Sequence, residues 1–139
     1  MLKTFSVTDI GRKRKLNQDY VYTSEAPVGS LPNLFIVADG MGGHRAGDYA
    51  SKLAVTTMVE AIEGMEAGET AAVLGRAVDR ANAAVYGSAE ETPELEGMGT
   101  TVVAAVCERE TLHVANVGDS RLYVINGNEI RQITRDHSW

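Results

Sequence analysis

Two aspartates of this chain lie where short apolar stretches meet turn residues. Asp39 follows the unbroken apolar run from Leu34 to Ala38, and Asp19 directly precedes the short stretch from Tyr20 to Thr23. Carboxylate oxygens are the ligands that hard divalent cations such as Mg²⁺ and Mn²⁺ prefer. Adjacent buried carboxylates repel each other unless a cation neutralises them. If the two turns converge in space, the sequence predicts an oxygen-only metal site.

A third acid, Asp119, has a similar setting, because it follows an apolar stretch from Leu112 to Val117 and the turn residue Gly118. It would join the other two aspartates if all three strand ends met. For Asp119 alone, a Gly-Asp hairpin turn is the simpler interpretation.

The loop after Asp39 reads GMGGH, from Gly40 to His44. Its glycines allow positive φ and a close approach of an ion to the backbone, although glycine-rich junctions also occur for packing reasons alone. A dinucleotide-binding fingerprint that starts at Gly40 would need a glycine at position 45, where Arg45 stands. A Walker-type phosphate loop needs Gly-Lys, a pair that this sequence lacks. Both nucleotide-binding motifs are therefore excluded.

The composition predicts a single globular domain over residues 1–139. The chain has 139 residues, 44% of them hydrophobic, and one cysteine, Cys107, which we expect to be a small core residue in a reducing, cytoplasmic setting. Its apolar runs are too short to span a bilayer, and its start lacks a secretory signal, so we expect a soluble protein.

The net charge of -6 is unevenly distributed. Residues 60–96 carry nine acids and two arginines, a pattern that predicts helices with an acidic solvent face. Arg12, Lys13, Arg14 and Lys15 form a compact basic cluster, which suits a solvated turn or an anionic substrate. Because no broad basic surface with interleaved aromatic residues follows from the sequence, we expect no nucleic-acid partner.

The elements that must position these residues follow from the spacing of apolar side chains. Strands, two adjacent amphipathic helices and further strands predict an α+β layered fold, with the helices antiparallel on a sheet. We expect the strand over residues 34–38 to be buried on both faces. The expected strands are 2–8 (weak), 20–23, 34–38 and a meander of 100–107, 112–117, 122–125 and 129–133, with a charged turn over 9–15 and helices over 46–65 and 70–87.

Five segments together resemble the metal-dependent protein phosphatases, the type 2C serine/threonine family, and most of all its bacterial members. They occur in the order in which that family carries its signature motifs and span nearly the whole chain. They are TDIGRKRKLNQD (8–19), VADGMGGHRAGDYAS (37–51), GMGTT (97–101), ANVGDSRLY (115–123) and ITRDHS (133–138).

The resemblance implies roles for individual residues. Asp39 would bridge two Mn²⁺ or Mg²⁺ ions, with the carbonyl of Gly40 on one of them. Asp19 would bind the second site largely through water, and Asp119 would belong to a third, weaker metal site. The metal-activated water would hydrolyse phosphoserine and phosphothreonine in proteins, so the implied partners are phosphorylated proteins.

Two further roles come from the same resemblance. Arg14 would grip the substrate phosphate, and His44 would be the general acid. By themselves, Arg14 is one exposed base in a run of four, and His44 suits a helix cap as well as catalysis. Asp136 and His137 receive no catalytic role.

The resemblance also implies what lies outside this sequence. The family builds a layered α-β-β-α fold with two antiparallel sheets, and later motifs supply two more metal-binding aspartates. Because the sequence ends at Trp139, we expect an incomplete domain in which the second helical layer is largely missing. Weak metal binding, and dimerisation or strand exchange through exposed edges, would follow. The alternative function is a catalytically weak or inactive phosphoprotein-binding or regulatory module.

Overall fold

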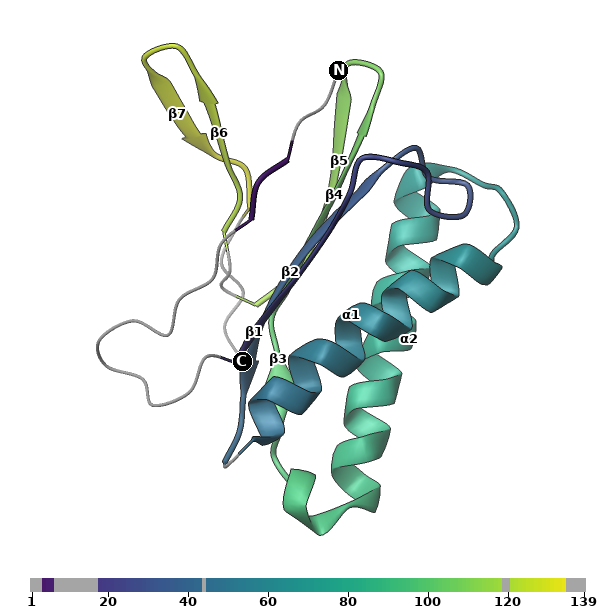
Figure 1. The fold of residues 1–139 in the computed structure, drawn as a ribbon, viewed down its shortest axis with the longest axis vertical. Helices are drawn as coiled ribbons and strands as arrows, with labels where there is room; N and C mark the ends of the chain where they lie inside the picture. Colours follow the sequence, from purple (N-terminus) through teal and green to yellow (C-terminus); the bar gives the residue numbers. More distant parts are fainter. Residues whose placement is uncertain (1–3, 7–17, 44, 119–120, 135–139) are drawn as a thin grey trace.

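A sheet covered on one face by two helices forms the body of the molecule (Figure 1). The structure, a computed structural model, describes residues 4–6, 18–43, 45–118 and 121–134. Its elements are β1 (Asp19–Ser24), β2 (Leu34–Met41), α1 (Ala46–Gly64), α2 (Thr70–Glu91), the 3₁₀ helix η1 (Pro93–Leu95), β3 (Gly99–Thr100), β4 (Val102–Glu108), β5 (Thr111–Val117), β6 (Tyr123–Asn126) and β7 (Glu129–Gln132).

The main sheet is antiparallel, with the strand order β1-β2-β4-β5 and with β3 also paired to β2. The hairpin of β6 and β7 forms a separate two-stranded sheet, which lies on the opposite side of the main sheet from the helices (Figure 1). The predicted α+β class is confirmed. The predicted continuous meander is wrong for the described residues, because β6 pairs with β7 and not with β5.

Strand β2 differs from its prediction in two ways. It continues past Ala38 to Met41, because β1 and β3 pair with residues beyond the apolar run, so Asp39 lies within the strand. Its side chains alternate between buried and more exposed positions, and Val37 is 45% exposed. The prediction of burial on both faces is therefore wrong, since the described residues bury only the face that the helices cover.

The two helices form where the apolar spacing predicts them. Helix α1 begins and ends within one residue of its predicted bounds, whereas α2 continues about one turn beyond Gly87, up to Thr92 and the proline of η1. Each helix directs its apolar stripe at the other helix and at the sheet, and Met58 is fully buried, as expected of a core residue. The core they enclose consists mainly of Leu31, Leu34, Ile36, Ala50, Ala54, Val55, Met58, Ile62, Val73, Leu74, Ala77, Ala104 and Val106.

The predicted strands at both ends of the described chain also need adjustment. Residues 4–6 lie in no strand, and the rest of the stretches predicted as a strand over 2–8 and a turn over 9–15 lies outside the described residues. The predicted strand over 100–107 is divided into β3 and β4 at Thr101. At this position the Thr101 Oγ1 accepts a hydrogen bond from the amide of Asp39 in β2. The Asn-Gly turn between β6 and β7 is confirmed, with Gly127 at a φ of 59°.

A buried asparagine joins the start of β2 to the end of β4. Asn33 is 5% exposed, its Nδ2 donates to the carbonyl oxygen of Cys107 at 2.7 Å, and its Oδ1 accepts from the Cys107 amide at 2.8 Å. Cys107 itself is a free, half-buried thiol. The amide of Asn33 therefore fastens the two central strands at the end opposite Asp39.

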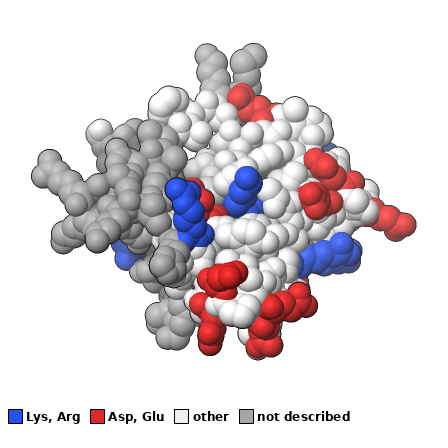
Figure 2. Space-filling model, turned by 60° about the horizontal axis from the view of Figure 1, so that its bottom comes forward, with Lys and Arg blue, Asp and Glu red and all other residues white. Residues whose placement is uncertain are grey.

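The acids of residues 60–96 are all exposed, which confirms the predicted acidic solvent face. Figure 2 shows acidic side chains over much of the described surface in this view, with several basic side chains among them. Among the described residues, neither helix combines the length and the apolar character that a membrane span requires.

Candidate metal centre

The structure brings Asp19 and Asp39 together. Asp19 is the first residue of β1, and its Cα partner across the antiparallel ladder is Asp39 of β2. Directly opposite residues point to the same face of a sheet, with Cβ atoms about 4.5–5.5 Å apart. Both aspartates are partly exposed. Two carboxylates from separate segments can thus approach one cation or a pair of cations.

The face that carries the two aspartates is the one the helices leave uncovered. In β2, Leu34, Ile36 and Ala38 are buried and face the helices, so the alternation of the strand directs Asp39 to the other side. The two carboxylates therefore lie on the face of the sheet opposite the helices, where both are partly exposed among the described residues.

Gly40 and Gly47 position the aspartates by letting α1 approach the sheet. A Cβ at Gly40 would lie 2.5 Å from the carbonyl carbon of Gly47 in the first turn of α1, and closer still to its oxygen. The amide of Gly40 donates to the carbonyl oxygen of Gln18 at 3.0 Å, next to Asp19. A Cβ at Gly47 would lie 2.6 Å from the side chain of Gln18. The glycines thus pack the strand start, the strand end and the helix start against one another.

Thr101 and Gly118 extend this site across the sheet. Thr101 donates its amide hydrogen to the Asp39 carbonyl oxygen at 2.9 Å, and the Asp39 amide donates to Thr101 Oγ1 at 3.1 Å. A Cβ at Gly118, whose φ is 95°, would lie 2.6 Å from Thr101 Cγ2. Asp19, Asp39, Thr101 and Gly118 therefore form one row across four chain segments. Sequence reasoning missed Thr101 as a site residue, although the GMGTT segment pointed to it.

Several predicted site residues lie outside the described residues, namely Arg14, His44 and Asp119, as do Asp136 and His137. Their roles therefore stay predictions. The N-cap of α1 is Arg45, and both interpretations of His44, as a helix cap and as a general acid, stay predictions. The carbonyl of Gly40 also stays a predicted ligand.

The described residues fit a hard divalent cation. The paired groups are carboxylates, an oxygen donor set suited to Mg²⁺ or Mn²⁺, and their placement opposite each other would be unfavourable for two like charges without a counterion. Within residues 18–43, 45–118 and 121–134, no group of three or more His, Cys, Asp or Glu side chains could hold a metal. The described residues therefore offer two neighbouring carboxylates, Asp19 and Asp39, that such a centre could use.

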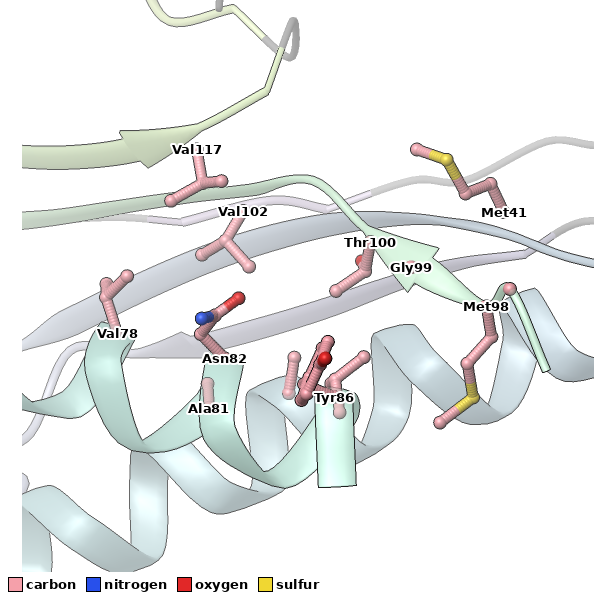
Figure 3. Close-up of a pocket in the computed structure, with 13 residues that line it drawn as sticks. Met41, Val78, Ala81, Asn82, Tyr86, Met98, Gly99, Thr100, Val102 and Val117 are labelled. Carbon is pink, nitrogen blue, oxygen red and sulfur yellow. The ribbon is translucent and has the colours of Figure 1, made fainter. Parts of the chain in front are cut away.

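A separate cavity of about 290 Å³ lies on the helix side of the sheet, between α2 and the strands (Figure 3). Its lining has no carboxylate, imidazole or thiol. Tyr86 lines it, and a hydrogen bond with Glu90, together with the charge of Glu90, raises the pKa of this phenol above its ordinary value. That shift makes Tyr86 a poorer acid near neutral pH. The cavity therefore lacks groups for the chemistry predicted at Asp39.

The sequence is similar to protein phosphatases over nearly its whole length. A family model described as protein phosphatase 2C matches residues 11–138. The serine/threonine phosphatase stp of Listeria welshimeri is 42% identical over 135 residues, which cover 94% of this chain and 53% of the relative. The chain thus spans about half the length of that curated relative.

Solved structures of similar proteins share the fold. The structure of the serine/threonine phosphatase Stp1 from Staphylococcus aureus matches with a TM-score of 0.82 and 37% identity, covering 95% of this chain and 52% of that one. The catalytic domain of the serine/threonine protein phosphatase PstP, solved in complex with two manganese ions, matches with a TM-score of 0.79 and 37% identity, covering 94% of this chain and 54% of that one.

Proposed function

Because the chain belongs to the protein phosphatase 2C family, we propose that the protein hydrolyses phosphoserine and phosphothreonine in other proteins, with Mn²⁺ or Mg²⁺ as its cofactor. The single observation that carries the proposal is the pairing of Asp19 with Asp39 directly across two strands. The complex of PstP with two manganese ions supports the same assignment.

In this proposal Asp39 and the Gly40 carbonyl would hold the cations directly, and Asp19 would hold the second one largely through water. When bound, two divalent cations lower the pKa of a shared water and neutralise phosphate charge. Asp39 is held for this task through its main chain, because both its amide and its carbonyl bond to Thr101.

The remaining roles are proposed for residues outside the described part of the chain. The guanidinium of Arg14 would hold two phosphate oxygens in a bidentate pair. His44 would donate a proton to the departing serine or threonine oxygen, a task suited to a group that titrates near neutral pH. Asp119 would bind a third, weaker metal ion.

The test is hydrolysis of p-nitrophenyl phosphate and of phosphothreonine peptides by this chain with Mn²⁺, with Mg²⁺ and after chelation. We expect turnover only with a divalent cation, and its loss in Asp39→Asn. The matched control is Asp79→Asn, which makes the same change on the exposed surface of α2 and should keep the activity of the unaltered chain. Equal activity in Asp39→Asn, or after thorough chelation, would contradict the proposal.

Two further measurements test His44 as the general acid and the alternative of a module that binds phosphoproteins without hydrolysing them. His44→Ala should slow phosphothreonine hydrolysis more than p-nitrophenyl phosphate hydrolysis, because p-nitrophenolate leaves without a proton. Binding of phosphopeptides without turnover in Mn²⁺ would instead favour a phosphoprotein-binding or regulatory module.

We extend the proposal to location and assembly. The lone cysteine suits a cytoplasmic setting, and fractionation of cells that express the protein tests it. Apolar side chains such as Val37 and Ile130 are exposed. They suit self-association in which a second copy of the chain packs on the exposed face of the sheet or exchanges a strand with it. Light scattering at increasing concentration checks this proposal, and a constant monomer mass would contradict it.

A further inference from the structure

Thr101 makes two hydrogen bonds to the main chain of Asp39. Its amide donates to the Asp39 carbonyl oxygen at 2.9 Å, and its Oγ1 accepts from the Asp39 amide at 3.1 Å. The second bond replaces the ladder bond that a backbone carbonyl makes in regular antiparallel pairing. Thr101 therefore bonds to both the amide and the carbonyl group of Asp39.

The two branches of the Thr101 side chain make different contacts. The residue is 3% exposed, so water is largely excluded from the bond between Asp39 and the hydroxyl. Its methyl group, Cγ2, packs against Gly118, where a Cβ would lie only 2.6 Å away. The hydroxyl thus serves Asp39 on one side, and the methyl fills the space toward the end of β5 on the other.

We propose that Thr101 is a positioning residue that holds Asp39 in place for metal binding. This inference rests on the proposed function. An amide that loses its acceptor gains from moving toward another partner or water, and a movement of the Asp39 backbone changes the position of its carboxylate relative to Asp19. Groups that orient a metal ligand typically change metal affinity by about 10–100-fold when they are removed.

The experiment measures Mn²⁺ affinity of the 139-residue chain by titration calorimetry or by the electron paramagnetic resonance signal of free Mn²⁺. Thr101→Val keeps the shape and removes the acceptor, and we expect about tenfold weaker binding. Thr101→Ser keeps the acceptor and should therefore bind Mn²⁺ about tenfold more tightly than Thr101→Val does. Thr101→Ala differs from Thr101→Ser only in the hydroxyl. If Thr101→Val fails to fold, comparing the Mn²⁺ affinities of the alanine and serine variants still measures the effect of the hydroxyl.

Two controls separate positioning from general damage. Thr56→Val makes the same chemical change in α1, where the hydroxyl bonds to Lys52 and Leu53 of its own helix, and should leave Mn²⁺ affinity unchanged. In amide hydrogen exchange, the Asp39 amide should exchange faster in Thr101→Val, while the Gly40 amide, bonded to Gln18, should keep its rate.

The outcomes separate a failure of the metal site at Asp39 from a failure of the positioning role of Thr101. If Asp39→Asn weakens Mn²⁺ binding and the serine and valine variants of Thr101 bind equally well, the positioning role is overturned and the metal site stands. Equal weakening in the serine and valine variants likewise overturns the role of the hydroxyl. If Asp39→Asn leaves Mn²⁺ binding unchanged, the metal proposal fails, and the positioning role fails with it.

Discussion

Replacing Gly40 by alanine should destabilise the protein, because this glycine lets α1 contact the strand that carries Asp39. The added Cβ would lie 2.5 Å from the Gly47 carbonyl carbon and 3.0 Å from its Cα. All of these atoms belong to backbone, so no side-chain rotation relieves the overlap. The first turn of α1 or the end of β2 must move.

The size of the effect follows from these distances. Carbon atoms in ordinary contact are about 3.5–4.0 Å apart, and the Gly47 carbonyl oxygen would lie closer to the new Cβ than the carbonyl carbon does. The Gly47 backbone must therefore move away by more than about 1 Å. Overpacking of a fitted interior costs about 1–3 kcal/mol, and alanine in place of glycine recovers about 0.4–1 kcal/mol by restricting the unfolded chain. We expect a net loss of about 1–2 kcal/mol in the free energy of unfolding, which lowers Tm by about 3–8 °C in a chain of this size.

Gly43→Ala is the matched control, since no heavy atom lies within 4 Å of a Cβ at that position. Urea unfolding followed by circular dichroism should place Gly43→Ala within about 0.5 kcal/mol of the unaltered chain, as for other surface substitutions. Mn²⁺ affinity should fall in Gly40→Ala because the end of β2 moves. Equal stabilities of the two variants would refute the close approach of α1 to β2.

Three further predictions concern other parts of the molecule. Asn33→Ala should lower the free energy of unfolding by about 2 kcal/mol, measured in urea, because two polar backbone groups of Cys107 lose their partners; an unchanged midpoint would contradict this role. Gly75→Ala should raise Tm, because Gly75 lies within α2 and no atom lies within 4 Å of a new Cβ. Alanine in a helix is about 1 kcal/mol more favourable than glycine, so an unchanged Tm would argue against a helix at this position. Mn²⁺ should raise the Tm of the unaltered chain and not that of Asp39→Asn, and a similar rise in both would mean that the ion binds elsewhere.

Much of the fold could be predicted from local sequence patterns. The helix from Ala46 to Gly64 formed as expected because its apolar residues recur at helical spacing. The Asn-Gly turn between β6 and β7 has its own local signal. The errors arose where distant segments decide the outcome. Nothing local to residues 34–38 states that the helices cover only one of their faces, and nothing local to Thr101 states that its hydroxyl replaces a ladder bond.

The sequence by itself determined which residues could hold a cation, because residue type sets the ligand chemistry and the ordered motifs set the family. Only the tertiary structure decided that Asp19 lies opposite Asp39 and that Thr101 bonds to Asp39. The physical reason is that strand register is a property of two segments together. A shift of one residue between β1 and β2 would direct one of the aspartates to the opposite face of the sheet.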